Sequence, residues 1–456
     1  MNPMGKIFAF TVSLALVGCA VNTPVPSPGL AAPPAWNEAA APGSSVVAPD
    51  WWNSFASTEL AALVTEALAG SPDLAIATER VRQAEAQVRV AGSSLFPSLD
   101  LGFNSRGSRT EGTSSESSSA SLSASYEVDL WGRNRAGVRA AEAGLRATTY
   151  DRETARITLV AGVANAYFEV LSLRGRLAVA RENLAIAERV LALVQARARS
   201  GAVSPLDVAR QEAAVLSQRA ALLPLEQLER QTLAALAVLT GRLPEGFDVK
   251  AAGVAALSVP SISPGLPADL LARRPDLAAA EAGLAAANAD LSAARAALLP
   301  SIQLTGSAGV ASGALLAFVN GPATTVALAA SVLQPIFNGG RLRAGVTIAE
   351  SRERELVETY RKAILAAFAD VESVLAANSR LAQREALQAQ VQERAREALR
   401  LAEVRYREGA DDLLTVLDAQ RTLFSADDQL AQVRLERLET AVALYRALGG
   451  GWQGTV

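Results

Sequence analysis

The chain of 456 residues contains the same pattern twice. Segment 71–74 (Ser-Pro-Asp-Leu) matches 274–277 (Arg-Pro-Asp-Leu), and 95–99 (Leu-Phe-Pro-Ser-Leu) matches 298–302 (Leu-Leu-Pro-Ser-Ile), both offset by 203 residues (275 minus 72). Arg133 with Arg341 and Gly201 with Gly409 are offset by 208 (409 minus 201), so five residues are added in between, where we expect a loop tip. A period of this length indicates a duplicated unit, here one interwoven body.

The first residues predict export and lipid attachment. Residues 1–18 form a signal peptide, with Lys6 before a short apolar run that cannot span a bilayer. Leu16, Val17 and Gly18 precede Cys19 as in a bacterial lipobox, which is typical of cleavage before the cysteine and its acylation. Ala20 stands where aspartate would retain a lipoprotein in the inner membrane, so the outer membrane is expected. More than one acyl chain is needed for stable anchoring, and a lipoprotein cysteine carries them.

The composition excludes several classes of protein. Histidine is absent, there is a single cysteine, and both methionines lie in the signal peptide, so neither a disulfide nor a soft-metal site is expected. The net charge of −3 does not suggest a nucleic-acid partner. With no histidine and no nucleophile beside a base, an enzyme is the least favoured reading. We expect no cofactor besides the covalent lipid on Cys19.

Hydrophobic periodicity predicts helices and strands in each half. Residues 19–50, rich in proline, alanine and glycine, read as an extended tether, after which Trp51, Trp52 and Phe55 begin ordered structure. A helical pattern follows up to Pro97, and alternating residues then predict two strands on either side of a polar loop at 106–119. A disordered serine linker is the alternative for that loop. The second half repeats this order, with alternation around 313–322.

Very long helical tracts follow the strands. Residues 135–199 and 342–408 contain no proline, and at ~1.5 Å per residue each would be on the order of 100 Å long. Such tracts predict coiled-coil packing between neighbouring helices. The expected organisation is a signal peptide (1–18), a lipidated tether (19–50), repeat 1 (51–241), an equatorial linker (242–267), repeat 2 (268–450) and a tail (451–456). Within the repeats we expect hairpins at about 98–131 and 301–337, long helices at 134–199 and 340–408, and returning helices at 203–240 and 412–448.

Four strands cannot close a barrel, and an open sheet leaves unpaired backbone groups in lipid. Yet the alternation is that of a membrane-barrel wall. Two, three or four copies of the chain would supply eight, twelve or sixteen strands, all within the range of known barrels. The fold class expected is therefore mainly helical with membrane strands.

Several motifs in order resemble those of the TolC/OprM outer-membrane efflux channels, in particular the NodT-type lipoprotein branch serving resistance-nodulation-division pumps. The resemblance covers essentially the whole mature chain. Its carriers are the two Pro-Asp-Leu segments, the two Pro-Ser segments, 129–133 (Asp-Leu-Trp-Gly-Arg), 335–340 (Pro-Ile-Phe-Asn-Gly-Gly), 417–421 (Leu-Asp-Ala-Gln-Arg) and 444–452 (Leu-Tyr-Arg-Ala-Leu-Gly-Gly-Gly-Trp).

The resemblance implies a homotrimer with a twelve-stranded barrel in the outer membrane and a helical tunnel in the periplasm. It implies that a periplasmic adaptor couples the tunnel to an inner-membrane pump of the resistance-nodulation-division type, and that the channel is a passive duct for small molecules. Its expected location is the outer membrane, anchored by lipid, with no nucleic-acid partner.

The family's periplasmic gate carries over to the turn after Gly409. Leu414 and Asp418 match positions that ring the closed aperture, and Arg421 lies one turn further along the same helix face, where we expect it to bind carboxylates of a neighbouring helix. Asp207 matches a position that helps to close the tip, but Asp411 occupies the position of its usual basic partner.

Two further regions carry over from the family. Gly201 and Gly409 mark the tips where the adaptor would dock. Trp131, Gly132, Gly339 and Gly340 mark the joins between strand and helix, with Trp131 expected at the lipid–water boundary. Solvated charges and ordinary turn packing are the alternatives for the gate and join residues.

Two other functions compete with drug efflux. The first is an exit duct for one-step polypeptide secretion, which the same family also serves. The second is a lipid-anchored periplasmic coiled-coil scaffold or adaptor, which would need no strands. The lipobox and the Gly449 to Trp452 ending favour efflux of small molecules.

Overall fold

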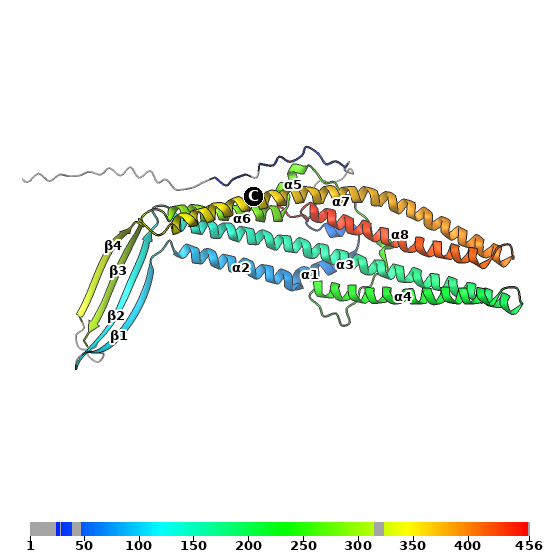
Figure 1. Ribbon diagram of the computed structural model, residues 1–456, viewed down its shortest axis with the longest axis horizontal. Helices are drawn as coiled ribbons and strands as arrows, with labels where there is room; N and C mark the ends of the chain where they lie inside the picture. Colours follow the sequence, from blue (N-terminus) through cyan, green and yellow to red (C-terminus); the bar gives the residue numbers. More distant parts are fainter. Residues whose placement is uncertain (1–23, 28, 39–46, 111, 314–322, 455–456) are drawn as a thin grey trace, which may run out of the picture. The chain divides into compact units, whose positions relative to one another are not determined.

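A computed structural model describes residues 24–27, 29–38, 47–110, 112–313 and 323–454 (Figure 1). The signal peptide, Cys19 and residues 314–322 therefore lie outside the described residues. Eight α-helices, two short 3₁₀ helices and four strands make up the described part. In chain order they are η1 (Trp51–Phe55), α1 (Thr58–Gly70), α2 (Pro72–Ser93), β1 (Ser98–Thr110), β2 (Thr113–Val128), α3 (Arg133–Arg199), α4 (Pro205–Leu239), η2 (Val254–Ala256), α5 (Pro267–Arg273), α6 (Pro275–Ala296), β3 (Ser301–Ser312), β4 (Ala323–Leu333), α7 (Arg341–Arg407) and α8 (Leu413–Ala447).

The two repeats are visible in the lengths of the helices. α2 and α6 each have 22 residues, α3 and α7 each have 67, and α4 and α8 each have 35. The long and returning helices begin and end within two residues of their predicted bounds. Pro72 and Pro275 are each the first residue of their helix, where a missing N–H costs nothing.

The chain divides into two compact units, each built from both repeats. Within the described residues, unit 1 comprises those of 24–27, 83–146 and 281–359, and unit 2 those of 29–82, 147–280 and 360–454. The repeats are thus interwoven as expected, but the expectation of a single body is wrong. Long helices such as α3 contribute residues to both units, so a boundary in the sequence pattern does not mark a boundary in space.

The four strands of unit 1 form one antiparallel sheet in the order β1-β2-β3-β4. The prediction of a polar loop at 106–119 is wrong, because β1 and β2 stay paired as far as Thr110 and Thr113. Cross-strand hydrogen bonds between serine hydroxyls, Ser105 to Ser118 (3.0 Å) and Ser108 to Ser115 (2.8 Å), replace the apolar contacts that the alternation signal depends on. Of the five extra residues in repeat 2, only two fall within its hairpin, and three lengthen the segment between β4 and α7.

Unit 2 contains two hydrophobic clusters. In the larger one, Trp51 stacks on Tyr445 of α8 and Phe55 contacts Phe168 of α3, with ring centroids 4.8 and 4.9 Å apart. This confirms that the first aromatic residues pack against later elements. The smaller cluster joins α3, α7 and α8, with residues such as Val194, Leu399 and Val416 at its centre. α3 has a window apolar enough to cross a membrane, but 72% of it is buried within the protein, as in a core helix.

The described part of the predicted tether is attached to unit 2. The indole Nε1 of Trp36 donates a hydrogen bond to the Gly265 carbonyl (3.0 Å), and its ring contacts Phe368. Asn37 donates to Glu372 of α7 at 3.0 Å through both its backbone and its side-chain nitrogen. Trp36 and Asn37 are therefore held against unit 2.

Candidate functional site

The sheet of unit 1 has one apolar and one polar face. Strand register places Leu101 beside Leu122, Leu122 beside Ala308 and Ala308 beside Val326, so one apolar row crosses all four strands. The opposite face carries Ser123, Ser307 and other small polar side chains. Apolar residues continue along β3 from Ile302 to Val310, which is about 26 Å at ~3.3 Å per residue. Allowing for strand tilt, this approaches the height of the apolar band of a transmembrane barrel.

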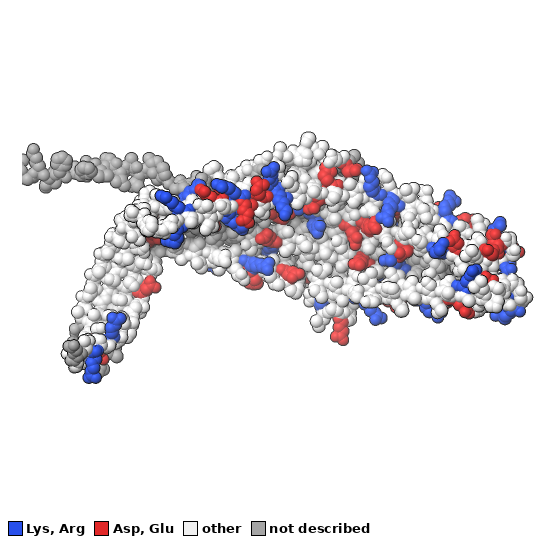
Figure 2. Space-filling view, in the orientation of Figure 1, with Lys and Arg blue, Asp and Glu red and all other residues white. Residues whose placement is uncertain are grey.

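The apolar face is exposed to solvent in the single chain. Leu101, Val326 and Leu328 have 81, 71 and 87% of their surface exposed. Figure 2 shows few charged side chains on the sheet, and most of these lie towards the tip of the hairpin. Within the described residues β1 pairs only with β2, and β4 only with β3, so both edges keep unpaired backbone groups. An exposed apolar face and open strand edges are both features of surfaces that contact lipid or another protein.

The joins between strand and helix contain the predicted residues. Gly132, Gly339 and Gly340 all have positive φ (76, 62 and 83°), a backbone conformation that favours glycine at both joins. The indole Nε1 of Trp131 donates a 2.7 Å hydrogen bond to the Pro300 carbonyl, so this residue ties repeat 1 to the start of β3. Its placement at a lipid boundary remains a prediction.

Asp129 holds the start of α3. Its carboxylate accepts hydrogen bonds from the backbone N–H groups of Asn134 (3.0 Å) and Arg135 (2.9 Å), and from the Arg135 guanidinium. Burial raises the pKa of this carboxyl, but these hydrogen bonds outweigh it and hold the pKa below its usual value. A carboxylate at a helix N-terminus is favourable, which explains the acid in the motif at 129–133.

Gly201 and Gly409 form the turns at the tips of the two helix pairs in unit 2. Their φ angles are 75 and 76°, and each is followed by a capped helix. Ser204 and Asp207 form a capping box on α4, whereas the Asp412 side chain accepts a hydrogen bond from the Thr415 N–H (3.0 Å) on α8. The two tips thus share a backbone shape but differ in side chains.

Asp418 and Arg421 lie together on α8. Arg421 Nη2 is 2.5 Å from Asp418 Oδ1, and both side chains are exposed (83 and 63%). Leu414, one turn earlier on the same helix, is also exposed. In the single chain Arg421 binds its own helix and not a carboxylate of a neighbouring one. Asp418, Arg421 and Leu414 line a pocket of about 360 Å³ between α4 and α8.

Asp207 and Asp411, two other acids near the tips, are engaged locally. Asp207 caps α4, and Asp411 forms an ion pair with Arg405 at 2.5 Å. That hydrogen bond lowers the pKa of Asp411. Asp411 therefore stabilises the turn in which it lies.

An unpredicted contact joins the tips of α3 and α7. The guanidinium of Arg197 lies 4.7 Å from the ring centroid of Tyr406 and donates a hydrogen bond to the Tyr406 carbonyl. The Tyr406 hydroxyl is buried without a hydrogen-bond partner among the described atoms. Burial raises its pKa, Arg197 opposes that rise and Asp207 adds to it. The sequence offers one signal for this contact. Arg197 stands shortly before the turn glycine Gly201, and Tyr406 stands shortly before the turn glycine Gly409.

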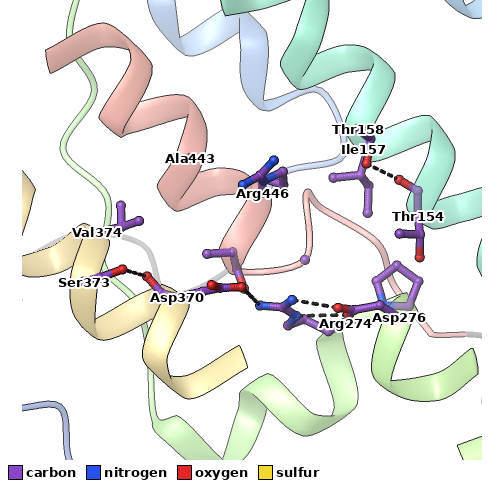
Figure 3. A pocket seen from close by; sticks show the side chains of 13 residues that line it. Thr154, Ile157, Thr158, Arg274, Asp276, Asp370, Ser373, Val374, Ala443 and Arg446 are labelled. Carbon is purple, nitrogen blue, oxygen red and sulfur yellow. Dashed lines mark hydrogen bonds and ion pairs between the residues drawn. The ribbon is translucent and has the colours of Figure 1, made fainter. Parts of the chain in front are cut away.

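The second Pro-Asp-Leu segment forms an ion-pair cluster beside a pocket of about 360 Å³ (Figure 3). Arg274, with its side chain 12% exposed, contacts Asp276 at 2.7 Å and Asp370 of α7 at 3.4 Å, and donates to the Ala447 carbonyl of α8. Burial raises the pKa of Asp276, but the hydrogen bond and charge of Arg274 bring it below its usual value. The arginine links α6, α7 and α8, so we assign the cluster to stability.

Within the described residues, no group of three or more histidine, cysteine, aspartate or glutamate side chains is placed to hold a metal ion. The lipobox residues Leu16, Val17, Gly18 and Cys19 lie outside the described part.

Comparison with known proteins identifies the class. The model of the outer membrane efflux protein family matches residues 63–242 and 266–450, one stretch in each repeat. The pyoverdine export outer membrane protein OpmQ of Pseudomonas aeruginosa is 45% identical over 96% of this chain and 95% of its own. Its counterpart in Pseudomonas putida is 43% identical over 97 and 96%.

Structural comparison agrees. The open state of the Neisseria gonorrhoeae MtrE outer membrane channel superposes with a TM-score of 0.86 and 31% identity, covering 95% of this chain and 98% of that one. The chain belongs to the outer membrane efflux protein family. This confirms the resemblance, the fold class, the outer-membrane location and the role as an exit duct for efflux.

Proposed function

We propose that three copies of the chain assemble into the outer-membrane duct of a tripartite efflux pump, anchored by acyl chains on Cys19 and gated at its helix tips. The observation that carries the proposal is the sheet of unit 1, with a continuous apolar face and two open edges. Lipid tolerates the face but not the edges, because unpaired backbone groups there have no water to bind. Pairing β1 of one copy with β4 of the next removes every edge.

Three copies are favoured by the family resemblance and give twelve strands. The polar face then lines a water-filled lumen, since the apolar face must contact lipid. The tips at Gly201 and Gly409 are where an adaptor would bind, and through it an inner-membrane pump of the resistance-nodulation-division type. The duct itself carries out no chemistry.

The gate is assigned to Asp418 and its partner. Three Asp418 carboxylates around a narrow axis would repel anions and attract cations, while each Arg421 holds its own aspartate in one rotamer. Leu414 adds an apolar ring one turn nearer the tip. Opening then requires the α8 helices to separate.

A small secreted molecule is the favoured cargo. Both relatives above are named for pyoverdine export, and the chain matches them over nearly their whole length. Polypeptide secretion remains the second candidate. Its only support is that the family which the chain resembles also serves that purpose.

Two experiments test the proposal. Light scattering of the full chain in detergent should give the mass of three copies, and a stable water-soluble monomer without membrane strands would contradict it. A deletion strain should become sensitive to antibiotics, detergents and dyes, or retain a pyoverdine-like product in the periplasm. Loss of a secreted polypeptide with unchanged drug sensitivity would instead favour the second candidate.

A further inference from the structure

Within the described residues, the β1–β2 hairpin continues past the point where the pairing with β3 ends. β2 pairs with β3 only as far as Ser118, which lies opposite Ser312. β1 and β2 remain paired beyond this point, from Arg106 opposite Ser117 to Thr110 opposite Thr113. At ~3.3 Å per residue, this is an extension of about 15 Å.

The two arginines of this extension lie on opposite faces. Side chains alternate along a strand, so Arg106 shares the polar face with Asp100 and Asn104. Arg109 continues the row of Leu101 and Phe103 on the apolar face. In a closed barrel, Arg106 therefore points towards the pore and Arg109 away from it.

Arg106 is the one cation on the polar face of the described strands. Asp100 and Glu127 are the other charged residues there, and both lie towards the opposite end of the sheet. Glu127 is 3.6 Å from Arg133, whereas Arg106 makes no ion pair with any described residue. Asp100 is six residues from Arg106 along β1, or about 20 Å, which exceeds the screening length of ~10 Å at 0.1 M salt.

The position of Arg106 is stiffened by its neighbours. The Ser108–Ser115 hydrogen bond (2.8 Å) lies on the same face, and the Ser105–Ser118 bond (3.0 Å) lies on the other face just before it. The arginine thus extends from paired backbone, one residue past the level where β3 ends.

We propose that Arg106 determines the charge preference of the duct at its outer rim, where three copies would place three guanidinium groups around the lumen. A ring of like charge on a pore wall raises the local concentration of counter-ions, so the rim favours anionic solutes over cationic ones. The inference rests on the proposed trimeric duct.

The test is ion selectivity of the full lipidated chain in planar bilayers under a tenfold KCl gradient. Arg106→Gln should shift the reversal potential towards cation selectivity, and Arg106→Glu should shift it further. Arg109→Glu is the matched control, since it makes the same charge change three residues away on the opposite face, and should leave the reversal potential unchanged.

A second measurement tests directly whether the side chain at position 106 faces the pore. An anionic thiosulfonate reagent added to the outer side should reduce the current of Arg106→Cys but not of Arg109→Cys. A conducting wild type whose reversal potential is the same in Arg106→Glu, or shifts equally in Arg109→Glu, overturns the role of Arg106 alone. A wild type that forms no conducting assembly overturns the duct itself, and this inference with it.

Discussion

Gly241 at the end of α4 lies directly against the backbone carbonyl of Gly70 at the end of α1. A Cβ on Gly241 would come within 2.2 Å of the Gly70 oxygen, and φ of Gly241 is 77°. Repeat 2 has the same contact between Gly449 (φ 92°) and the Arg273 carbonyl, with a Cβ distance of 1.9 Å. Gly241 and Gly449 are 208 positions apart, and Gly70 and Arg273 are 203 apart, which are the two offsets of the sequence motifs. The duplication is therefore also seen in a single backbone contact.

Gly241→Ala should destabilise unit 2. An alanine costs about 1–2 kcal/mol in the left-handed conformation, and overpacking against the Gly70 carbonyl adds about 1–3 kcal/mol. The matched control is Gly246→Ala, because Gly246 has φ 71° but no atom within 4 Å of its Cβ position. Thermal unfolding in detergent should show a clearly lower Tm for Gly241→Ala than for the control, and equal shifts would contradict the packing argument.

Removing the exposed pair at the proposed gate should raise conductance. The double variant Asp418→Ala, Arg421→Ala removes the charges around the aperture without changing the buried face of α8. Glu397→Ala, Arg400→Ala is the control, since that pair has the same three-residue spacing and a 2.6 Å contact on α7. Conductance in planar bilayers should rise for the first variant alone. An unchanged value would remove the gate assignment.

Arg197→Ala should loosen the tips of α3 and α7. It removes the cation held over the Tyr406 ring and the hydrogen bond to the Tyr406 carbonyl. We expect faster hydrogen–deuterium exchange in the segments around Gly201 and Gly409. Arg199→Ala, an exposed neighbour in the same helical turn, is the control. Exchange that is as slow as in the wild type would show that the contact does not restrain the tips.

Glu439→Gln should stabilise the protein at neutral pH. Burial raises the pKa of Glu439, and the nearby Glu169 and Glu436 raise it further. The charged form is therefore disfavoured in the fold, so this penalty is full above the folded pKa and disappears below about 4.5.

The Tm gain of Glu439→Gln should thus be largest at pH 7–8 and vanish as the pH approaches 4.5. Glu188→Gln should give no gain, because that carboxylate is exposed and paired with Arg219 at 2.8 Å. A gain that is independent of pH would exclude carboxyl ionisation as its cause.

The helical part of the fold could be predicted closely from the sequence. Helix ends are local, and Pro72, Pro275, Gly201 and Gly409 mark them by backbone geometry alone. The hairpin was predicted, but its outer part was taken for a loop because serine side chains carry no alternation between apolar and polar residues. Its pairing depends on hydroxyl groups across the strands, which only the register reveals.

Of the site residues, those at turns and joins were found where expected. The partners of Arg421, Asp207 and Asp411 were not predictable, since each lies within a single turn where several bonds are sterically possible. The Arg197–Tyr406 contact joins residues 209 positions apart, and the sequence signals it only through their similar places before the two turn glycines. The lipid on Cys19 and the trimer stay predictions.

The equal lengths of α3 and α7, and of α4 and α8, have a consequence for whatever binds below the membrane. The helix pair α3–α4 and the helix pair α7–α8 have the same helix lengths. A three-fold assembly would therefore present six helix-pair ends of nearly the same shape in a ring. Their chemistry alternates, with Ser204 and Asp207 at one end and Asp411 and Asp412 at the next. A docking protein would therefore meet pseudo-six-fold symmetry in the backbone but only three-fold symmetry in charge.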